Sequence, residues 1–288
     1  GGRWNTALMD HSTIAGGRWN TVQGTAATVA GGQRNTAAAS YSLVAGGSDH
    51  SVTQQYAVVT GGQANVASAF WSTVAGGRAN SAVKEYSVVV AGYNNTAAEN
   101  YAMVAGGTGN VVSGFYSTVV GGYHNVIDES YAVVAGGLSN RVSGRYGTVS
   151  GGRTNTVTAR HATVNGGQRN NAGVDHSVIG GGWLNTNLGQ YGVIGGGQQN
   201  IVSGSKAVVV GGERNTASGL EAVVLGGHAN SATGEMSFIG SGQQSQATAK
   251  YSTVISGRYQ MATGFGSAIV GGKENTASYL KGKSLTLC

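Results

Sequence analysis

The sequence predicts an all-β protein that folds as a parallel β-solenoid of about nineteen 15-residue coils. Three observations predict it: an unbroken 15-residue period, a glycine at the second position of every unit, and a short β-branched run that ends each unit. Because proline is absent and no Gly-X-Y period occurs, the 52 glycines do not indicate collagen. Self-similarity at a fixed short period is the signature of stacked repeats.

Each unit is numbered here from position 1 to position 15, starting at Gly1, and a typical unit reads GGRANSAVKEYSVVV at residues 76–90. The glycine pair and the two variable residues after it predict a turn at positions 1–4. Positions 5–8, typically Asn-Thr-Ala-Ser, predict a weak strand, and positions 9–10 predict a looser turn. Positions 11–15 predict a second strand, rich in β-branched residues. No helix is expected, because the glycines return before a helix could form.

Strand alternation predicts which positions face the interior of the coil. Positions 12 and 14, a small residue followed by Val or Ile, are expected to face positions 5 and 7, which carry Asn and a small apolar residue. The repeated Asn side chains are expected to form a ladder in which each amide bonds the next. The predicted structural ladder is represented by Gly2, Gly17, Asn5, Asn20 and Asn35.

The register divides the chain into residues 1–270, which form eighteen full coils, and residues 271–288, which begin a nineteenth coil and then diverge. The only cysteine is Cys288, so no disulfide within the chain is possible. The chain starts on a repeat boundary without methionine, and it is therefore expected to be a piece of a longer protein.

The outward face of the predicted strand at positions 11–15 carries an apolar stripe, exemplified by Tyr86, Val88, Tyr131 and Val133. A stripe repeated over eighteen coils does not usually stay exposed on a soluble monomer. Positions 6 and 8 of the other strand carry mostly Thr and Ser and can face water. The contrast between the two faces predicts a homo-oligomer with cyclic symmetry, in which those four residues lie at the interface.

A family resemblance supports the same prediction. Residues 112–127 approximate the phrase Ala-Ser-Gly-x-Tyr-Ser-x-Val-x-Gly-Gly-x-x-Asn-x-Ala, which resembles the head repeats of trimeric autotransporter adhesins and related repeats of phage and other tail fibres. The resemblance implies a left-handed β-roll in a trimeric fibre, extracellular on a cell or virion surface, that binds a host receptor or glycan. The family's usual unit has 14 residues, whereas this unit has 15. Residues 1–288 contain no neck, coiled-coil stalk or membrane anchor, so this segment by itself is not expected to support autotransport.

The sequence offers little for catalysis or for cofactors. A calcium-binding solenoid needs Asp after its glycines, whereas this repeat carries Asn there and the chain has only 11 acidic residues. The six histidines do not cluster at metal-ligand spacing. The net charge of +6 is scattered, which does not indicate nucleic-acid binding, and no apolar run is long enough to insert into a membrane. We therefore expect a non-enzyme with no catalytic residue, no metal and no cofactor.

The candidate ligand-binding residues lie at positions 3 and 4, on the turn that follows the glycines. Exposed arginines and aromatic residues are favoured at recognition surfaces, and arginines suit acidic sugars or other anionic polymers. The alternative interpretation is a weakly constrained turn. The candidates are Arg3, Trp4, Arg18, Trp19, Arg34, Tyr123, Trp183 and Arg258.

Three functions remain open at this stage. The first is a fibre segment that mediates adhesion or receptor recognition as a stiff repetitive rod, and the second is a purely structural fibre shaft or spacer. The third, ice binding, requires a regular threonine array. Threonine recurs at position 13 but alternates with Val, Leu, Met and Phe, which disfavours ice binding.

Overall fold

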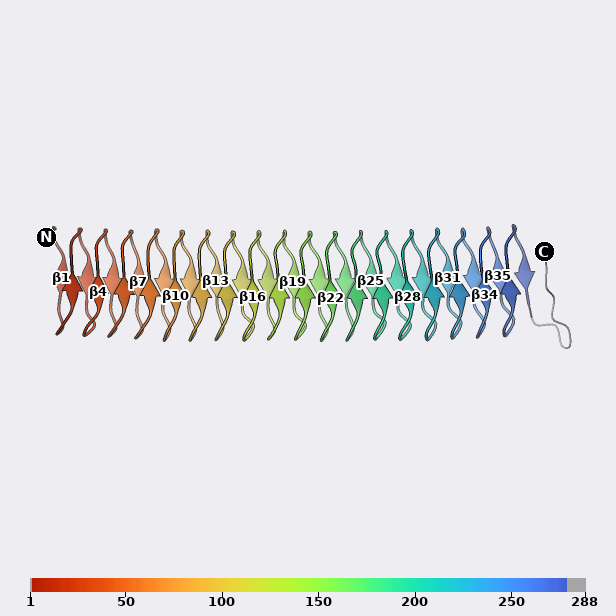
Figure 1. The fold of residues 1–288 in the computed structure, drawn as a ribbon, viewed down its shortest axis with the longest axis horizontal. Helices are drawn as coiled ribbons and strands as arrows, with labels where there is room; N and C mark the ends of the chain where they lie inside the picture. Colours follow the sequence, from red (N-terminus) through yellow and green to blue (C-terminus); the bar gives the residue numbers. More distant parts are fainter. Residues whose placement is uncertain (1, 279–288) are drawn as a thin grey trace. The chain divides into compact units, whose positions relative to one another are not determined.

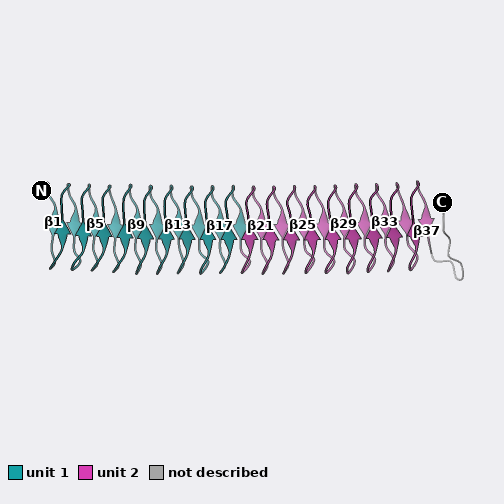
Figure 2. Cartoon of the chain, viewed as in Figure 1, with its two compact units in different colours: residues 1–142 teal, residues 143–288 magenta. Residues whose placement is uncertain are grey.

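The computed structural model describes residues 2–278, which contain β-strands and turns and no helix. The predicted parallel β-solenoid is confirmed: each 15-residue coil contributes one strand to each of two parallel sheets, over about 18–19 turns (Figure 1). The chain divides into two compact units, residues 1–142 and residues 143–288, which are coloured separately in Figure 2. Residues 279–288, including Cys288 and the predicted divergent tail, lie outside the described residues.

Every strand has two residues, which occupy positions 6 and 7 in the odd-numbered strands and positions 13 and 14 in the even-numbered strands. The strands of unit 1 are β1 (Thr6–Ala7), β2 (Thr13–Ile14), β3 (Thr21–Val22), β4 (Thr28–Val29), β5 (Thr36–Ala37), β6 (Leu43–Val44), β7 (Ser51–Val52), β8 (Val58–Val59), β9 (Val66–Ala67), β10 (Thr73–Val74), β11 (Ser81–Ala82), β12 (Val88–Val89), β13 (Thr96–Ala97), β14 (Met103–Val104), β15 (Val111–Val112), β16 (Thr118–Val119), β17 (Val126–Ile127), β18 (Val133–Val134) and β19 (Arg141–Val142). The strands of unit 2 are β20 (Thr148–Val149), β21 (Thr156–Val157), β22 (Thr163–Val164), β23 (Asn171–Ala172), β24 (Val178–Ile179), β25 (Thr186–Asn187), β26 (Val193–Ile194), β27 (Ile201–Val202), β28 (Val208–Val209), β29 (Thr216–Ala217), β30 (Val223–Val224), β31 (Ser231–Ala232), β32 (Phe238–Ile239), β33 (Gln246–Ala247), β34 (Thr253–Val254), β35 (Met261–Ala262), β36 (Ala268–Ile269) and β37 (Thr276–Ala277).

The strands pair in parallel with a register of one repeat. In unit 1 Val74 of β10 pairs with Val89 of β12, and in unit 2 Ile194 of β26 pairs with Val209 of β28. Backbone amides at the strand positions donate to carbonyls of the next coil, as from Thr73 N to Ser87 O at 2.9 Å. Each coil therefore satisfies the backbone polar groups of its neighbour, which is why strands of two residues suffice.

The interior is filled as predicted by positions 5, 7, 12 and 14. Val59, Val74 and Ile194, all at position 14, have no exposed surface, and positions 7 and 12 are mostly buried Ala, Val and Ser. The alternation of inward and outward residues along each strand produces this arrangement. The core thus consists of short side chains in four columns.

The two glycines of each repeat have different roles. Gly62, at position 2, has a φ of +94°, and a Cβ there would overlap the carbonyl oxygen of Gly77 in the next coil. Nothing lies within 4 Å of a Cβ added at Gly61, at position 1. This difference explains why position 2 is glycine in every unit whereas Ala91 and Ser241 occur at position 1.

Two turn positions adopt left-handed backbone, and one of them corrects the sequence prediction. Positions 4 and 11 have φ near +55°, as at Trp19 and Tyr56, and their amides donate back to the preceding coil, as from Trp19 N to Arg3 O at 3.0 Å. The prediction that a strand begins at position 11 is therefore wrong, because position 11 belongs to a turn. β-branched residues disfavour this conformation, and among the described residues neither column contains Val or Ile, while Thr154 is the one β-branched residue found there.

The asparagine column lies inside the coil, and its hydrogen bonds differ from the predicted ladder of amides. The amide nitrogen of Asn35 donates to Gly31 O and to Gly47 O, both at 3.0 Å, and its Oδ1 accepts from the backbone of His50. Asn5 and Asn20 bond to glycine carbonyls in the same way. Backbone groups of the adjacent turns therefore take most of the bonds that were predicted to run from amide to amide.

Candidate functional site

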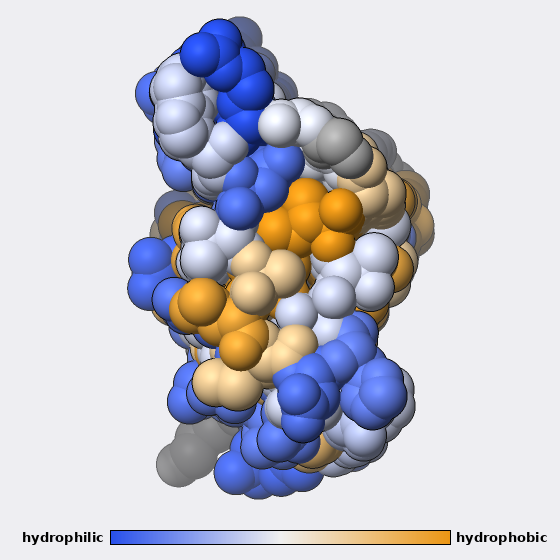
Figure 3. All heavy atoms as spheres, turned by 90° about the vertical axis from the view of Figure 1, so that its left-hand side faces the viewer, coloured by the Kyte–Doolittle hydropathy of each residue, from blue (hydrophilic) through white to orange (hydrophobic). Residues whose placement is uncertain are grey.

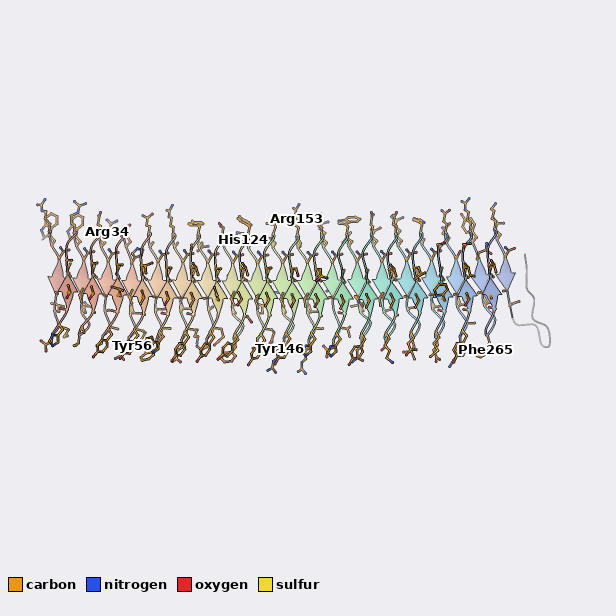
Figure 4. The ribbon with its side chains drawn as sticks, in the orientation of Figure 1. Arg34, Tyr56, His124, Tyr146, Arg153 and Phe265 are labelled. Atoms are coloured by element: carbon orange, nitrogen blue, oxygen red, sulfur yellow. The ribbon has the colours of Figure 1, made fainter. Side chains whose placement is uncertain are left out.

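The two turns of each coil place their variable side chains on opposite edges of the solenoid. In unit 1 the labelled Arg34 and His124 project from one edge and Tyr56 from the other (Figure 4). In unit 2 Arg153 projects from one edge, and Tyr146 and Phe265 from the other. We call these the position-3/4 edge, formed by positions 3 and 4, and the position-11 edge, formed by positions 10 and 11.

The position-3/4 edge of the first two coils holds four of the predicted ligand-binding residues in one cluster. The indole rings of Trp4 and Trp19 stack with 5.0 Å between centroids and an interplanar angle of 7°. The guanidinium of Arg3 lies 4.2 Å from the Trp4 centroid, and that of Arg18 lies 4.3 Å from the Trp19 centroid. The indoles are 56% and 41% exposed, which is unusual for tryptophan. We call these four residues the Arg-Trp cluster.

The next coil continues this edge with a neutralised arginine. The Arg34 guanidinium contacts both carboxylate oxygens of Asp49, from Nε at 2.5 Å and from Nη2 at 3.1 Å. The hydrogen bond from Arg34 is the main cause that lowers the pKa of the Asp49 carboxyl, and the same bond raises the pKa of Arg34. Arg34 is therefore less available to an anion than Arg3 or Arg18.

The other predicted ligand-binding residues lie on the same type of edge but outside the cluster. Tyr123 is exposed and packs edge to face on His124, with 4.1 Å between ring centroids. In unit 2, Arg258 lies 4.8 Å from the ring centroid of Tyr259 and donates to its hydroxyl at 3.2 Å. Trp183 is half-buried, and its backbone forms parallel β-bridges with Gln168 and Gln198 in the adjacent coils.

The position-11 edge carries aromatic rows, whereas the sequence pattern predicts these residues on the face of a strand. In unit 1 Tyr86, Tyr101 and Tyr116 stack with centroid distances of 4.9 and 4.4 Å. In unit 2 His161 and His176 stack at 4.9 Å, between the rings of Tyr146 and Tyr191. A column of aromatic residues without Val or Ile, directly after a glycine-rich turn, was the signal that could have indicated this placement.

The four predicted interface residues therefore do not share one face. Val88 and Val133 are the outward residues of β12 and β18, on the sheet formed by the even-numbered strands. Tyr86 and Tyr131 lie on the position-11 edge, in turns. The apolar outer surface of this sheet instead combines position 13 with position 15, where Val90 and Val120 are exposed.

One buried titratable group interrupts the asparagine column. His50 takes the place of Asn, is 1% exposed, and accepts at Nδ1 from the backbone of Asn65 at 3.1 Å, while its Nε2 has no hydrogen-bond partner. Burial lowers the pKa of the His50 imidazole, because the charged form loses hydration inside the coil. Burial of His50 therefore favours the neutral form of its imidazole.

Within residues 2–278, no three His, Cys, Asp or Glu side chains gather as a metal-binding group, and no helix could span a membrane. A comparison with models of known protein families and with curated proteins finds nothing that matches this chain.

Proposed function

We propose that this chain is a segment of an extracellular fibre, on a cell or virion surface, that mediates adhesion through the side chains on its turn edges. One observation carries the proposal: the inward columns are nearly constant and buried, whereas positions 3 and 4 are mostly exposed and change from coil to coil. Because a constant core leaves the turns free to vary, binding groups can change without disturbing the stack.

The proposal assigns no catalytic role and no cofactor to the chain. Polar side chains inside the coils are mainly bonded to the backbone of adjacent coils, as Asn20 and Asn35 are. Side chains committed in this way support the scaffold and are not poised to exchange protons with a substrate.

We further propose that the fibre is a homotrimer, with the outer surface of the even-strand sheet buried between copies. Within unit 1 this surface includes Val88, Val90, Val120 and Val133, and three of these four side chains are exposed. A long apolar row of this kind favours burial in an oligomer with cyclic symmetry. The aromatic rows of the position-11 edge, including Tyr86 and Tyr131, would border the interface.

The trimer is tested by replacing Val88 and Val133 with Asp and measuring mass by sedimentation. We expect the variant to dissociate, because burying an unpaired charge costs several kcal/mol. A control pair, Thr96→Asp with Ser81→Asp, places the charges on the other sheet and should leave the trimer intact. A stable, soluble monomer of the unaltered chain would overturn the trimer.

Adhesion is tested by binding the purified chain to cells and to surfaces coated with matrix proteins or glycans. We expect the unaltered chain to adhere, and the variant with Arg3, Trp4, Arg18 and Trp19 all replaced by Ala to adhere less while remaining folded. Equal adhesion by a folded variant would show that this edge is not the adhesive surface.

A purely structural shaft is the second candidate. It is favoured by the uninterrupted register, in which the strands of residues 2–278 pair in parallel at the same offset of one repeat, as between β8 and β10 and between β24 and β26. Adhesion to no surface at all by an intact fibre would favour the shaft. Ice binding stays a minor alternative, since β10, β12 and β14 present Thr73, Val88 and Met103 in succession where a regular threonine array is needed.

A further inference from the structure

We propose that the Arg-Trp cluster binds a sulfated glycan, with the guanidinium groups of Arg3 and Arg18 holding sulfate groups of one linear chain. This inference rests on the adhesion function proposed above and names the class of its ligand. Arg3 and Arg18 differ from Arg34, in the next coil of the same edge, in that Arg34 is paired with a carboxylate.

The guanidinium groups of Arg3 and Arg18 are exposed and lack an acidic partner. Among the described residues no carboxylate lies within 4.0 Å of either group, whereas Arg34 is bonded to Asp49. Arg18 has one weak contact, from Nη2 to Gln33 Oε1 at 3.5 Å. The first three coils contain a single acidic residue, Asp10, at position 10. Two cations are therefore exposed in a stretch of sequence that carries one negative charge. The view onto the N-terminal end shows hydrophilic residues at its top and bottom and hydrophobic residues between them (Figure 3).

The tryptophans order these cations before a ligand arrives. Each guanidinium lies over the indole of its own coil, and the two indoles stack on each other. An arginine stacked on an aromatic ring loses less conformational freedom when it binds than one that is free in solution. The indoles thus fix two guanidinium groups one coil apart, at a spacing of about 4.8 Å along the stack.

This arrangement favours a sulfated sugar chain over a nucleic acid. A planar guanidinium can bind two oxygens of one sulfate, and a linear glycan repeats such groups along its length. Binding of single-stranded nucleic acid instead depends on bases stacking on free aromatic faces. The 5.0 Å between the indole centroids leaves no room for a base between the rings, and a guanidinium already lies over each ring.

The test measures binding of the full chain to three immobilised probes at fixed ionic strength: a heparin oligosaccharide, its desulfated form, and a DNA oligonucleotide of equal charge. We expect binding to the heparin oligosaccharide only. Arg3→Gln with Arg18→Gln should weaken it by about tenfold or more, since bonds between charged groups are removed. Arg34→Gln is the matched control and should change binding less than about twofold, because that charge is already neutralised by Asp49.

A second variant separates ordering from charge. Trp4→Ala with Trp19→Ala keeps both arginines, and Ala64 and Ala79 already occupy the same turn position, so the coil should tolerate the change. We expect several-fold weaker binding, and Trp4→Phe with Trp19→Phe should restore most of it. Circular dichroism of every variant confirms the fold.

Three results would overturn the inference: no binding of the unaltered chain to the heparin oligosaccharide, equal binding to DNA, or equal losses for the Arg34 control and the Arg3/Arg18 variant. Each is distinguishable from failure of the proposed function. A chain that adheres to cells stripped of sulfated glycans keeps the adhesion function and contradicts this ligand. A chain that binds the heparin oligosaccharide but adheres to no cell supports this ligand and contradicts the adhesion function.

Discussion

The two units use the same backbone, but they accommodate irregular residues differently. In the described part of unit 1, position 7 is always Ala, Val or Ile, and the one irregular core residue is His50 in the asparagine column. Unit 2 carries a buried Asn187 at position 7, and Ser245 and Gln260 in the asparagine column. Each exception keeps at least one hydrogen bond to backbone, so a residue other than Asn or Ala is tolerated inside the coil when it makes such a bond.

Asn187 shows how one exception in unit 2 is compensated by its own coil and the preceding one. Its amide nitrogen donates to Gly192 O at 2.7 Å and to Val178 O at 3.1 Å, and its Oδ1 accepts from Gly189 N at 3.2 Å. Gly192 occupies position 12, where most coils have Ser or Ala, and a Cβ there would lie 2.6 Å from Asn187 Oδ1. The larger residue on one strand is therefore matched by a smaller one opposite it.

The largest expected effect concerns the glycine at position 2, which both units have in every coil. Gly62→Ala should destabilise the chain by about 3 kcal/mol or more, because the backbone is left-handed and the new methyl group would overlap Gly77 O. Gly61→Ala should change stability by less than about 0.5 kcal/mol. Chemical denaturation measures both, and the pair Gly212→Ala and Gly211→Ala should repeat the result in unit 2.

The second prediction tests whether Gly192 makes room for the larger Asn187 in unit 2. Gly192→Ala should cost about 2 kcal/mol, since overpacking a filled core is destabilising. Adding Asn187→Ala should recover part of that loss, because Ala is common at both positions in other coils. A double-mutant cycle by denaturation gives the coupling, and additive effects would show that the two residues are not matched.

The third prediction concerns the exception in unit 1 and its dependence on pH. Because burial lowers the pKa of His50, the folded state favours the neutral ring, while the unfolded chain takes up a proton below about pH 6.5. Stability from this site should be complete above pH 6.5 and decline as the pH falls toward the lowered folded pKa. His50→Asn should flatten thermal unfolding profiles between pH 7 and pH 5, and should add about 1 kcal/mol at pH 8, where Asn can bond both glycine carbonyls. An unchanged slope would contradict it.

The smallest expected effect comes from a change that gives the position-11 edge of unit 2 a longer aromatic row, like that of unit 1. In unit 2 this edge carries a salt bridge of 3.1 Å between exposed Lys206 and half-buried Glu221, and such surface pairs contribute little to stability. Replacing both with Tyr should extend the row from Tyr191 and raise stability by about 0.5–1 kcal/mol, as stacked rings do. Glu221→Gln alone should change stability by less than about 0.5 kcal/mol. Equal stability of the double variant and the unaltered chain would show that the rows of unit 1 contribute nothing.

Several features of the fold could be predicted from the residues. The invariant glycine and the constant Val or Ile at position 14 specified a 15-residue coil with positions 5, 7, 12 and 14 inside, because short repeats leave few ways to bury their apolar residues. The grouping of Arg3, Trp4, Arg18 and Trp19 on one edge was predicted for the same reason, since residues 15 apart must lie in adjacent coils.

Other features were decided only by the tertiary structure. Tyrosine is common in strands and uncommon in left-handed backbone, so residue type alone placed Tyr86 and Tyr131 on a strand. Backbone hydrogen bonds from each coil to the preceding coil hold position 11 in a turn. The bonds of Asn35 and the pairing of Arg34 with Asp49 also depend on atoms 12 or 15 residues away. The period determined which residues are neighbours, and the stacked backbone determined how those neighbours meet.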